Sequence, residues 1–262
     1  MTASPTRIAR SIEVFALAGI PMVRPGDDLA SLITDGVEAT GRALENGDVV
    51  VIAQKIVSKA EDRYADLGAV TPSPRALALA AQCDKDPRLV ELILAESQEV
   101  LRWRPGVLIV VHRLGVVLAN AGIDRSNVEG DGGAERVLLL PLDPDATCAR
   151  LRQALGQRTG AEVAVIINDS VGRAWRGGTV GIALGAAGLA ALDDQRQRPD
   201  LFGRPLEVSI EAVADELAAA ASLVQGQADE GTPVAVVRGF ARTGPETPAA
   251  ALIRSKTEDL FR

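Results

Sequence analysis

A polar turn that follows a long apolar stretch is the feature of this sequence that most constrains its fold. Residues 106–118 contain two short apolar runs rich in valine, and the turn at 119–127 carries Asn120, Asp124 and Asn127. Continuous apolar runs of this length predict strands that are buried on both faces. A loop held by such strands can keep side-chain oxygens still, as a hard metal ion or a phosphate-bearing ligand requires. The alternative is that these side chains only satisfy the backbone of the turn and cap the next element.

A second apolar run ends in the same kind of polar group. Residues 163–167 are apolar, and an Asn-Asp-Ser sequence that includes Asp169 follows them. Carboxylates at the ends of two buried strands could share one cation, because oxygen ligands suit hard metal ions. We therefore expect Asp124 and Asp169 to hold a metal ion together. Arg173 and Arg176 could then face the anion that this ion binds.

The inventory of reactive side chains excludes several classes of site. The only histidine, His112, stands at the end of an apolar run, and we expect it to be structural. Cys83 and Cys148 lie far apart and match no zinc-binding spacing, so we expect reduced thiols. A zinc site of His and Cys ligands is therefore excluded. Any metal ion here is predicted to be Mg²⁺ or Mn²⁺, held by carboxylate, amide and water oxygens.

The net charge and the lengths of the apolar runs narrow the choice of partners. The formal net charge is −7 and no long stripe of Lys and Arg offsets it, so we expect no nucleic-acid partner. No apolar run approaches the ~20 residues that are needed to cross a bilayer. The apolar stretch at 14–20 follows Glu13 and runs into Pro21, unlike a signal peptide. We expect a cytoplasmic protein with no membrane partner.

Strand and helix signals alternate along the chain, which is long enough for one large core or two modest ones. We interpret residues 1–10 as a leader, 11–245 as the main domain and 246–262 as a C-terminal tail. Strands are predicted at 12–17, 49–53, 106–111, 116–118, 137–142, 163–167 and 234–237. Helices are predicted from Asp27 or Asp28 to about residue 44, and at 73–83, 87–99, 143–156 and 210–224.

Two lysines after the strand at 49–53 suggest a phosphate site. If the extended conformation persists to residue 61, Lys55 and Lys59 point to one side, because strand side chains alternate. Two ammonium groups on one side suit a polyphosphate. The alternative is that both lysines are solvated and protect the edge of a sheet.

Three loops could complete a site. The loop at 18–23 contains glycine and proline and exposes backbone groups. Gln227 and Glu230 place oxygen donors where the last predicted helix ends, although a solvated helix terminus is the alternative. The glycine-rich loop at 129–133 could close over a site, and a surface loop is the alternative.

Two further segments have a composition that suggests a role. Small apolar residues at 177–188 predict close packing of strands or a binding floor made of backbone. The charged, turn-rich segment at 192–206 could be a lid, an insertion or a dimer contact.

Five motifs, in this order, resemble the F420-0:γ-glutamyl ligase family, the coenzyme F420:L-glutamate ligases. The likeness extends over about residues 12–240, and five ordered motifs are far more specific than any one of them. The motifs are Ala18-Gly19-Ile20-Pro21-Met22-Val23, Val57-Ser58-Lys59-Ala60-Glu61, Ala119-Asn120-Ala121-Gly122-Ile123-Asp124-Arg125-Ser126-Asn127, Asn168-Asp169-Ser170-x-Gly172-Arg173-x-Trp175-Arg176 and Gly226-Gln227-x-x-Glu230.

The resemblance implies a GTP-dependent ligase that joins L-glutamate to the lactyl carboxylate of coenzyme F420-0 and extends a γ-linked glutamate tail. It also implies an α+β fold of mixed sheets and packed helices, assembled as an intertwined homodimer. GTP is implied as co-substrate, Mn²⁺ or Mg²⁺ as cofactor and K⁺ as a further cation. Two-domain bacterial relatives continue into a nitroreductase-like flavin domain, so such a domain could be a separate partner of this chain.

The family's functional residues, carried over by motif position, fall on the clusters described above. The divalent-metal ligands fall on Asp124, Asp169, Ser170 and Gln227. The guanine-nucleotide contacts fall on Ile20, Pro21, Met22, Val23, Gln54, Lys55, Lys59, Asn127, Gln225, Gly226, Gln227, Ala228, Asp229, Glu230, Gly231 and Thr232. Residues expected to take part in catalysis are Asp124, Asp169, Lys59, Arg173 and Arg176, whereas Asn120 is expected to be structural.

The sequence departs from the family pattern at two positions, Ala174 and Gln225, where the family usually has proline and a bulky apolar residue.

Two other functions fit the same residues. One is a metal-dependent phosphohydrolase built on the two carboxylates, and the other is a non-catalytic nucleotide-binding dimer. By the ligase hypothesis, the acceptor carboxylate attacks the γ-phosphate and the glutamate amine captures the acyl phosphate, so no nucleophilic side chain is required.

Overall fold

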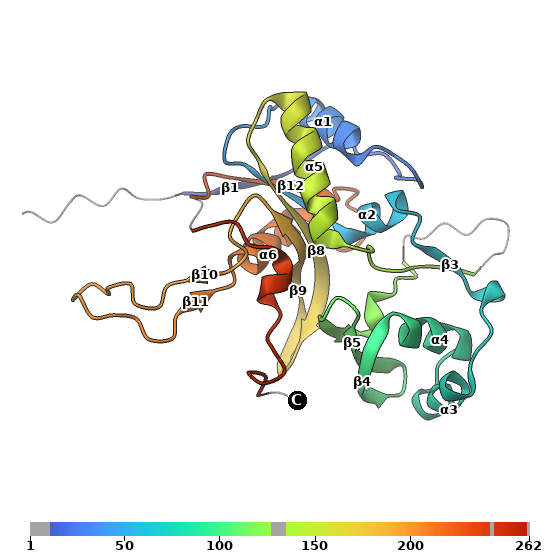
Figure 1. Ribbon diagram of the computed structural model, residues 1–262. Helices are drawn as coiled ribbons and strands as arrows, with labels where there is room; N and C mark the ends of the chain where they lie inside the picture. Colours follow the sequence, from blue (N-terminus) through green and yellow to red (C-terminus); the bar gives the residue numbers. More distant parts are fainter. Residues whose placement is uncertain (1–10, 127–134, 242–243, 261–262) are drawn as a thin grey trace, which may run out of the picture.

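The computed structural model describes residues 11–126, 135–241 and 244–260 (Figure 1). It combines helices with mixed and antiparallel sheets, which confirms the expected α+β fold class. The predicted leader at 1–10 and the glycine-rich loop at 129–133 lie outside the described residues. Within the described ranges, no helix is long and apolar enough to span a membrane.

A five-stranded sheet with the order β1-β12-β2-β8-β9 forms the centre of the protein. β2 and β8 run parallel, and the other neighbouring pairs are antiparallel. The parallel pair matters most for the site, because it brings the ends of two apolar runs to the same edge of the sheet. The strands are β1 (Glu13–Ala16), β2 (Val49–Ala53), β8 (Ala164–Arg173), β9 (Arg176–Ala187) and β12 (Val234–Arg238).

Both faces of the central sheet are covered by helices, as its continuous apolar strands require. One core lies between the sheet and the helices α1 (Leu29–Ala39) and α5 (Pro144–Thr159). A second core lies under α6 (Val213–Gln225) on the opposite face. Successive residues of β2 contribute alternately to these two cores, which explains why its valine-rich sequence shows no polar face.

A smaller module, formed by the sheet β4-β5-β6 and the helices α3 and α4, lies beside the central sheet (Figure 1). It has a hydrophobic core of its own. The Ser73 hydroxyl accepts a hydrogen bond from the backbone N–H of Ala76 and caps α3, as the Ser-Pro start predicts. The module's elements are α3 (Pro74–Cys83), α4 (Pro87–Ala95), β4 (Ser97–Arg104), β5 (Val107–His112) and β6 (Val117–Ala119).

Several predicted boundaries in the helices and strands were wrong. The first helix ends at Ala39 rather than near residue 44, because Gly41 turns the chain with φ +71. The helix predicted at 87–99 ends at Ala95, and its last residues belong to β4, which sequence analysis missed. The strand predicted at 137–142 is only β7 (Arg136–Leu138). β6 exposes Val117, so it is not buried on both faces.

Two short ladders extend the fold away from these sheets. β3 (Tyr64–Asp66) pairs antiparallel with β7 between the central sheet and the small module. β10 (Asp193–Asp194) pairs with β11 (Ile210–Glu211) at the base of an arm, residues 193–211, which points away from the body of the protein (Figure 1). β11 takes the first residues of the helix predicted at 210–224, so that helix begins at Val213.

The small residues at 177–188 allow close packing, as predicted. A Cβ atom at Gly185 would lie 2.5 Å from the carbonyl oxygen of Pro144, at the start of α5. At Gly181 it would lie 2.6 Å from the carbonyl oxygen of Ala218 in α6. Glycine therefore lets β9 contact helices on both faces of the sheet.

A buried ionic cluster ties the small module to the segment that follows α2 (Gln54–Ala60). Glu96 accepts hydrogen bonds from Arg63 Nη2 at 3.0 Å and from Arg113 Nε at 2.9 Å. His112 is fully buried, its Nδ1 accepts a hydrogen bond from the Leu114 N–H, and its Nε2 faces Glu96 Oε2 at 3.4 Å. The prediction that His112 is structural is confirmed.

We expect Glu96→Gln to destabilise the protein in a pH-dependent way. Burial alone would raise the pKa of Glu96, but the close approach of His112, the hydrogen bond from Arg113 and the charge of Arg63 outweigh it and lower the pKa to about 2. Because the folded-state pKa lies below the ordinary 4.5, this stability is present above about pH 4.5 and is lost as the pH falls towards 2. Urea unfolding at pH 7 should show a loss of about 3 kcal/mol, which shrinks at pH 3.

The matched control is Glu99→Gln, because Glu99 pairs with Lys256 at the surface, where the two side chains are 47% and 72% exposed. Its free energy of unfolding should change by less than about 1 kcal/mol. Equal losses in both variants would show that the Glu96 cluster does not stabilise the fold.

Candidate active site

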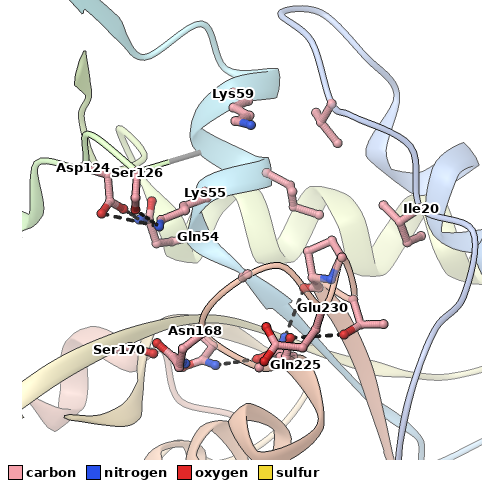
Figure 2. Close-up of a pocket in the computed structure, with 18 of the residues that line it drawn as sticks. Ile20, Gln54, Lys55, Lys59, Asp124, Ser126, Asn168, Ser170, Gln225 and Glu230 are labelled. Carbon is pink, nitrogen blue, oxygen red and sulfur yellow. Dashed lines mark hydrogen bonds and ion pairs between the residues drawn. The ribbon is translucent and has the colours of Figure 1, made fainter. Parts of the chain in front are cut away.

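A pocket of about 470 Å³ opens where the end of β2 and the middle of β8 meet three loops (Figure 2). The loops are the one after β1, the turn after β6 and the loop after α6. The pocket is lined by Ile20, Pro21, Met22, Val23, Ala53, Gln54, Lys55, Ile56, Lys59, Asp124, Ser126, Asn168, Asp169, Ser170, Gln225, Gly226, Gln227, Ala228, Glu230, Gly231, Thr232 and Pro233. The structure thus brings together all five sequence motifs.

The segment with the two lysines is helical rather than extended, so the condition under which Lys55 and Lys59 were expected to share one side is not met. α2 begins at Gln54, directly after β2. Lys55 and Lys59 still share one side because residues four apart are neighbours on a helix surface. Both line the pocket, and Lys59 is only 6% exposed. The interpretation of Lys59 as a solvated edge lysine is therefore wrong.

Asp124 is held in place by both its backbone and its side chain. Its backbone exchanges two hydrogen bonds of 2.9 Å with Leu138. Its Oδ2 accepts a hydrogen bond from Gln54 Nε2 at 2.8 Å, and its Oδ1 lies 3.5 Å from Lys55 Nζ. Burial raises the pKa of Asp124, and the charge of Lys55 offsets this only in part. The positive charge near the Asp124 carboxylate is therefore not enough to cancel the effect of burial on its pKa.

Asp169 lies inside β8 rather than after it, which corrects the predicted end of that strand at Ile167. The register between β8 and β9 shifts between Ile167 and Asn168, and such a bulge changes the direction of the following side chains. The pKa of Asp169 is raised to about 7, first by burial and then by the negative charge of Asp124. The two carboxylates are therefore close enough to repel each other.

The buried amides of Asn168 and Gln225 join β8 to the end of α6 (Figure 2). Asn168 Nδ2 donates to Gln225 Oε1 at 2.7 Å, and Gln225 Nε2 donates to the carbonyls of Val51 and Pro233 at 3.0 and 3.1 Å. Asn168 was not among the predicted site residues. An amide directly after a buried apolar run was the signal that could have identified it.

The loop after α6 is shaped by its own hydrogen bonds. Glu230 Oε2 accepts a hydrogen bond from the Ala228 N–H at 2.8 Å. Gly226 has φ +72, and a Cβ atom there would overlap the Glu230 carboxyl group. The Thr232 hydroxyl donates to the Gln225 carbonyl at 3.1 Å. The loop therefore presents a preformed wall opposite Ile20 and Met22.

A few predicted site residues are not brought into this pocket. Arg173 and Arg176 lie at the exposed end of the β8–β9 hairpin, where Arg173 Nη2 donates to the Gly177 carbonyl at 3.4 Å. Neither residue lines the pocket, nor does Asp229. Asn127 lies outside the described residues. Asn120 Oδ1 accepts a hydrogen bond from the Leu108 N–H at 3.1 Å, which confirms its structural role.

The donor set fits a hard divalent cation, Mg²⁺ or Mn²⁺, better than a zinc ion held by His and Cys side chains. Within the described ranges, no group of three or more His, Cys, Asp and Glu side chains could hold a metal ion. The pocket instead offers two carboxylates, Asp124 and Asp169, and is also lined by Ser170 and Gln227, whose side-chain oxygens are neutral. Carboxylates whose pKa values are both raised gain most from a bound divalent cation. Such a set leaves room for water and phosphate oxygens, as Mg²⁺ prefers.

Comparison with known proteins shows the family of this chain. Residues 19–239 match the F420-0:gamma-glutamyl ligase family. This chain belongs to that family. The matched range contains every residue that lines the pocket.

Similar proteins from three archaea are named coenzyme F420:L-glutamate ligase. The Methanothermobacter thermautotrophicus protein is 46% identical over 253 residues, covering 96% of this chain and 99% of the relative. The Methanopyrus kandleri protein is 46% identical over 245 residues, covering 92% and 93%. The Methanocaldococcus jannaschii protein is 39% identical over 255 residues, covering 97% and 98%. The likeness to the ligase family therefore covers nearly the whole chain.

We expect Gln225→Met to destabilise the protein by about 3 kcal/mol, because it leaves the buried Asn168 amide without its partner and removes the hydrogen bonds to the Val51 and Pro233 carbonyls. Urea unfolding at pH 7 measures this loss. Gln227→Met is the matched control, since Gln227 is exposed and its free energy of unfolding should change by less than about 0.5 kcal/mol. An unchanged stability in Gln225→Met would contradict the structural role of the amide pair.

Proposed function

We propose that this protein is a GTP-dependent ligase that joins L-glutamate to the lactyl carboxylate of coenzyme F420-0 and extends a γ-linked glutamate tail. Its membership of the ligase family supports the reaction class. The observation that carries the mechanism is the convergence of two lysines and two carboxylates on one pocket. Polyphosphate transfer needs this combination, because catalysis there rests on positioning and on neutralising charge.

In this proposal the nucleotide occupies the pocket between two walls. One wall is the loop from Ile20 to Val23, and the other is the loop from Gln225 to Thr232. Gln54, Lys55 and Lys59 are proposed to face the phosphates from α2. Asn127 and Asp229 stay proposed nucleotide contacts on motif position alone.

Asp124, Asp169, Ser170 and Gln227 would hold Mg²⁺ or Mn²⁺, which when bound supplies positive charge to the phosphates and the acceptor carboxylate. Lys55 already pairs with Asp124, so it is positioned to share charge between that carboxylate and a phosphate. Gln54 donates to Asp124 and keeps its carboxylate pointing into the pocket. K⁺ remains a further proposed cation of the site.

The proposed chemistry has two transfers. An oxygen of the acceptor carboxylate attacks the γ-phosphorus of GTP, the bond to the bridging oxygen breaks, and GDP leaves. The amine of glutamate then attacks the acyl carbon, inorganic phosphate leaves, and the proton lost from the amine passes to solvent. Lys59 is proposed to stabilise the transferring phosphoryl group. Arg173 and Arg176 are proposed to interact with the acceptor's anionic groups from the β8–β9 hairpin.

We also propose that the protein acts as a homodimer. The arm at residues 193–211 supports this, because Leu201, Phe202 and Val208 are 74%, 83% and 83% exposed. Apolar side chains on an extended arm are typical of a segment that packs against another chain.

We expect Asp124→Asn and Asp169→Asn each to reduce ligation at least 100-fold, because each removes a charge that would hold the divalent ion. The assay incubates purified protein with GTP, Mn²⁺, L-glutamate and F420-0, omits each component in turn, and follows products by mass spectrometry. Neither variant should unfold at a lower temperature than the parent in metal-free buffer, because removing one of two repelling carboxylates relieves strain. Glu38→Gln, an exposed residue of α1 outside the pocket, should keep full activity.

Three outcomes would overturn the ligase proposal. Normal glutamylation by both Asp variants would contradict the assigned site. Release of phosphate from GTP without acceptor or glutamate would identify a phosphohydrolase. Tight binding of GTP that stays intact in the complete mixture would identify a nucleotide-binding protein.

A further inference from the structure

A second pocket of about 480 Å³ adjoins the nucleotide pocket and has no assigned role. Met22, Val23 and Lys59 line both pockets, so the two share a wall. Its volume falls within the range of small-molecule sites, roughly 300–1,000 Å³. The second pocket is therefore positioned to hold a ligand that reacts with one bound in the first.

The register of the β3–β7 ladder connects this pocket to the proposed metal ligands. Asp66 lies opposite Arg136, Tyr64 lies opposite Leu138, and Leu138 forms a bridge with Asp124. Directly opposed residues project from the same face of a sheet, and so do residues two apart in a strand. Tyr64, Asp66 and Arg136 thus share a face with Asp124. A molecule lying on that face would extend towards the carboxylate of the first pocket.

The second pocket carries charged side chains of both signs. Its cationic side chains are Arg24, Lys59 and Arg136, and its anionic ones are Asp62 and Asp66. Arg136 lies with its guanidinium carbon 6.0 Å from the centre of the Tyr64 ring, which places that charge on the pocket wall. A small zwitterion with an extra carboxylate matches side chains of both signs in this pocket.

We propose that this second pocket binds the amino-acid substrate, with Arg136 holding a carboxylate of L-glutamate and Asp62 holding its ammonium group. This inference rests on the proposed ligase function, because it assigns the amine donor of that reaction. The shared wall at Lys59 places the bound amino acid next to the phosphates. Binding there keeps the amine and the activated acceptor in adjoining pockets, which favours their reaction by proximity.

The kinetic test compares Arg136→Met with the parent protein in GTP-dependent glutamylation of F420-0. The KM for L-glutamate should rise at least tenfold, as expected for loss of a charge-assisted hydrogen bond. The KM values for GTP and F420-0 should stay within about twofold. Arg104→Met, an exposed arginine of β4 outside both pockets, is the matched control and should change none of them.

Glutarate separates the two charge contacts because it carries both carboxylates of glutamate but no amine. As a competitive inhibitor it should bind Arg136→Met at least tenfold more weakly and bind Asp62→Asn as well as the parent. Asp62→Asn should still raise the KM for L-glutamate. Asparagine suits this position, where φ is +53, because it tolerates the left-handed conformation.

Direct binding of L-glutamate to the full chain, measured by saturation-transfer NMR, distinguishes a wrong assignment of this pocket from a wrong assignment of the ligase function. One outcome is that the parent protein binds L-glutamate, Arg136→Met abolishes this binding, and no glutamylated product forms. This outcome would contradict the ligase function and support the assignment of the pocket to glutamate. An unchanged KM for L-glutamate in Arg136→Met would overturn the pocket assignment. So would a rise confined to the KM for F420-0, which would make the second pocket the acceptor site.

Discussion

The parallel pairing of β2 with β8 decides where this protein can do chemistry. Ile52 pairs with Ile167 and Ala53 with Asn168, so both apolar runs end at one edge of the central sheet. The chain then turns into α2 on one side and continues through a bulge on the other. Without this register, the lysines of α2 and the carboxylate of Asp169 would not line the same pocket. A rigid, fully covered sheet thereby holds charges that would otherwise separate.

The main elements of the fold were predictable because their signals are local. Valine-rich strands, the Ser73 cap of α3 and the Asp143-Pro144 start of α5 each depend on neighbouring residues. Two carboxylates were also expected to meet, since each followed an apolar run, and both line one pocket. That expectation rested only on where the two strands were predicted to end. It identified Asp124 and Asp169 although the end of one strand was misplaced.

What sequence analysis missed depends on distant parts of the chain. The seven residues of α2 read equally well as a strand, because a short segment carries too little periodicity to decide. The partnership of Asn168 with Gln225 joins residues 57 apart in sequence, and no local pattern predicts it. The second pocket forms only where β3, β7 and the loop after β1 converge. Its charges appear in the sequence as scattered, ordinary surface residues.

The two carboxylates among the proposed metal ligands, Asp124 and Asp169, belong to different packing units. Asp169 is part of the central sheet, while the turn that carries Asp124 follows the small module, and Ala121 in that turn packs into the module's separate core. Separately packed units can open independently of each other. A ligand that contacts both carboxylates would couple their opening, and amide hydrogen exchange in the small module would slow when the pocket fills. Substrate binding and the cooperativity of the fold would then be linked through one pair of aspartates.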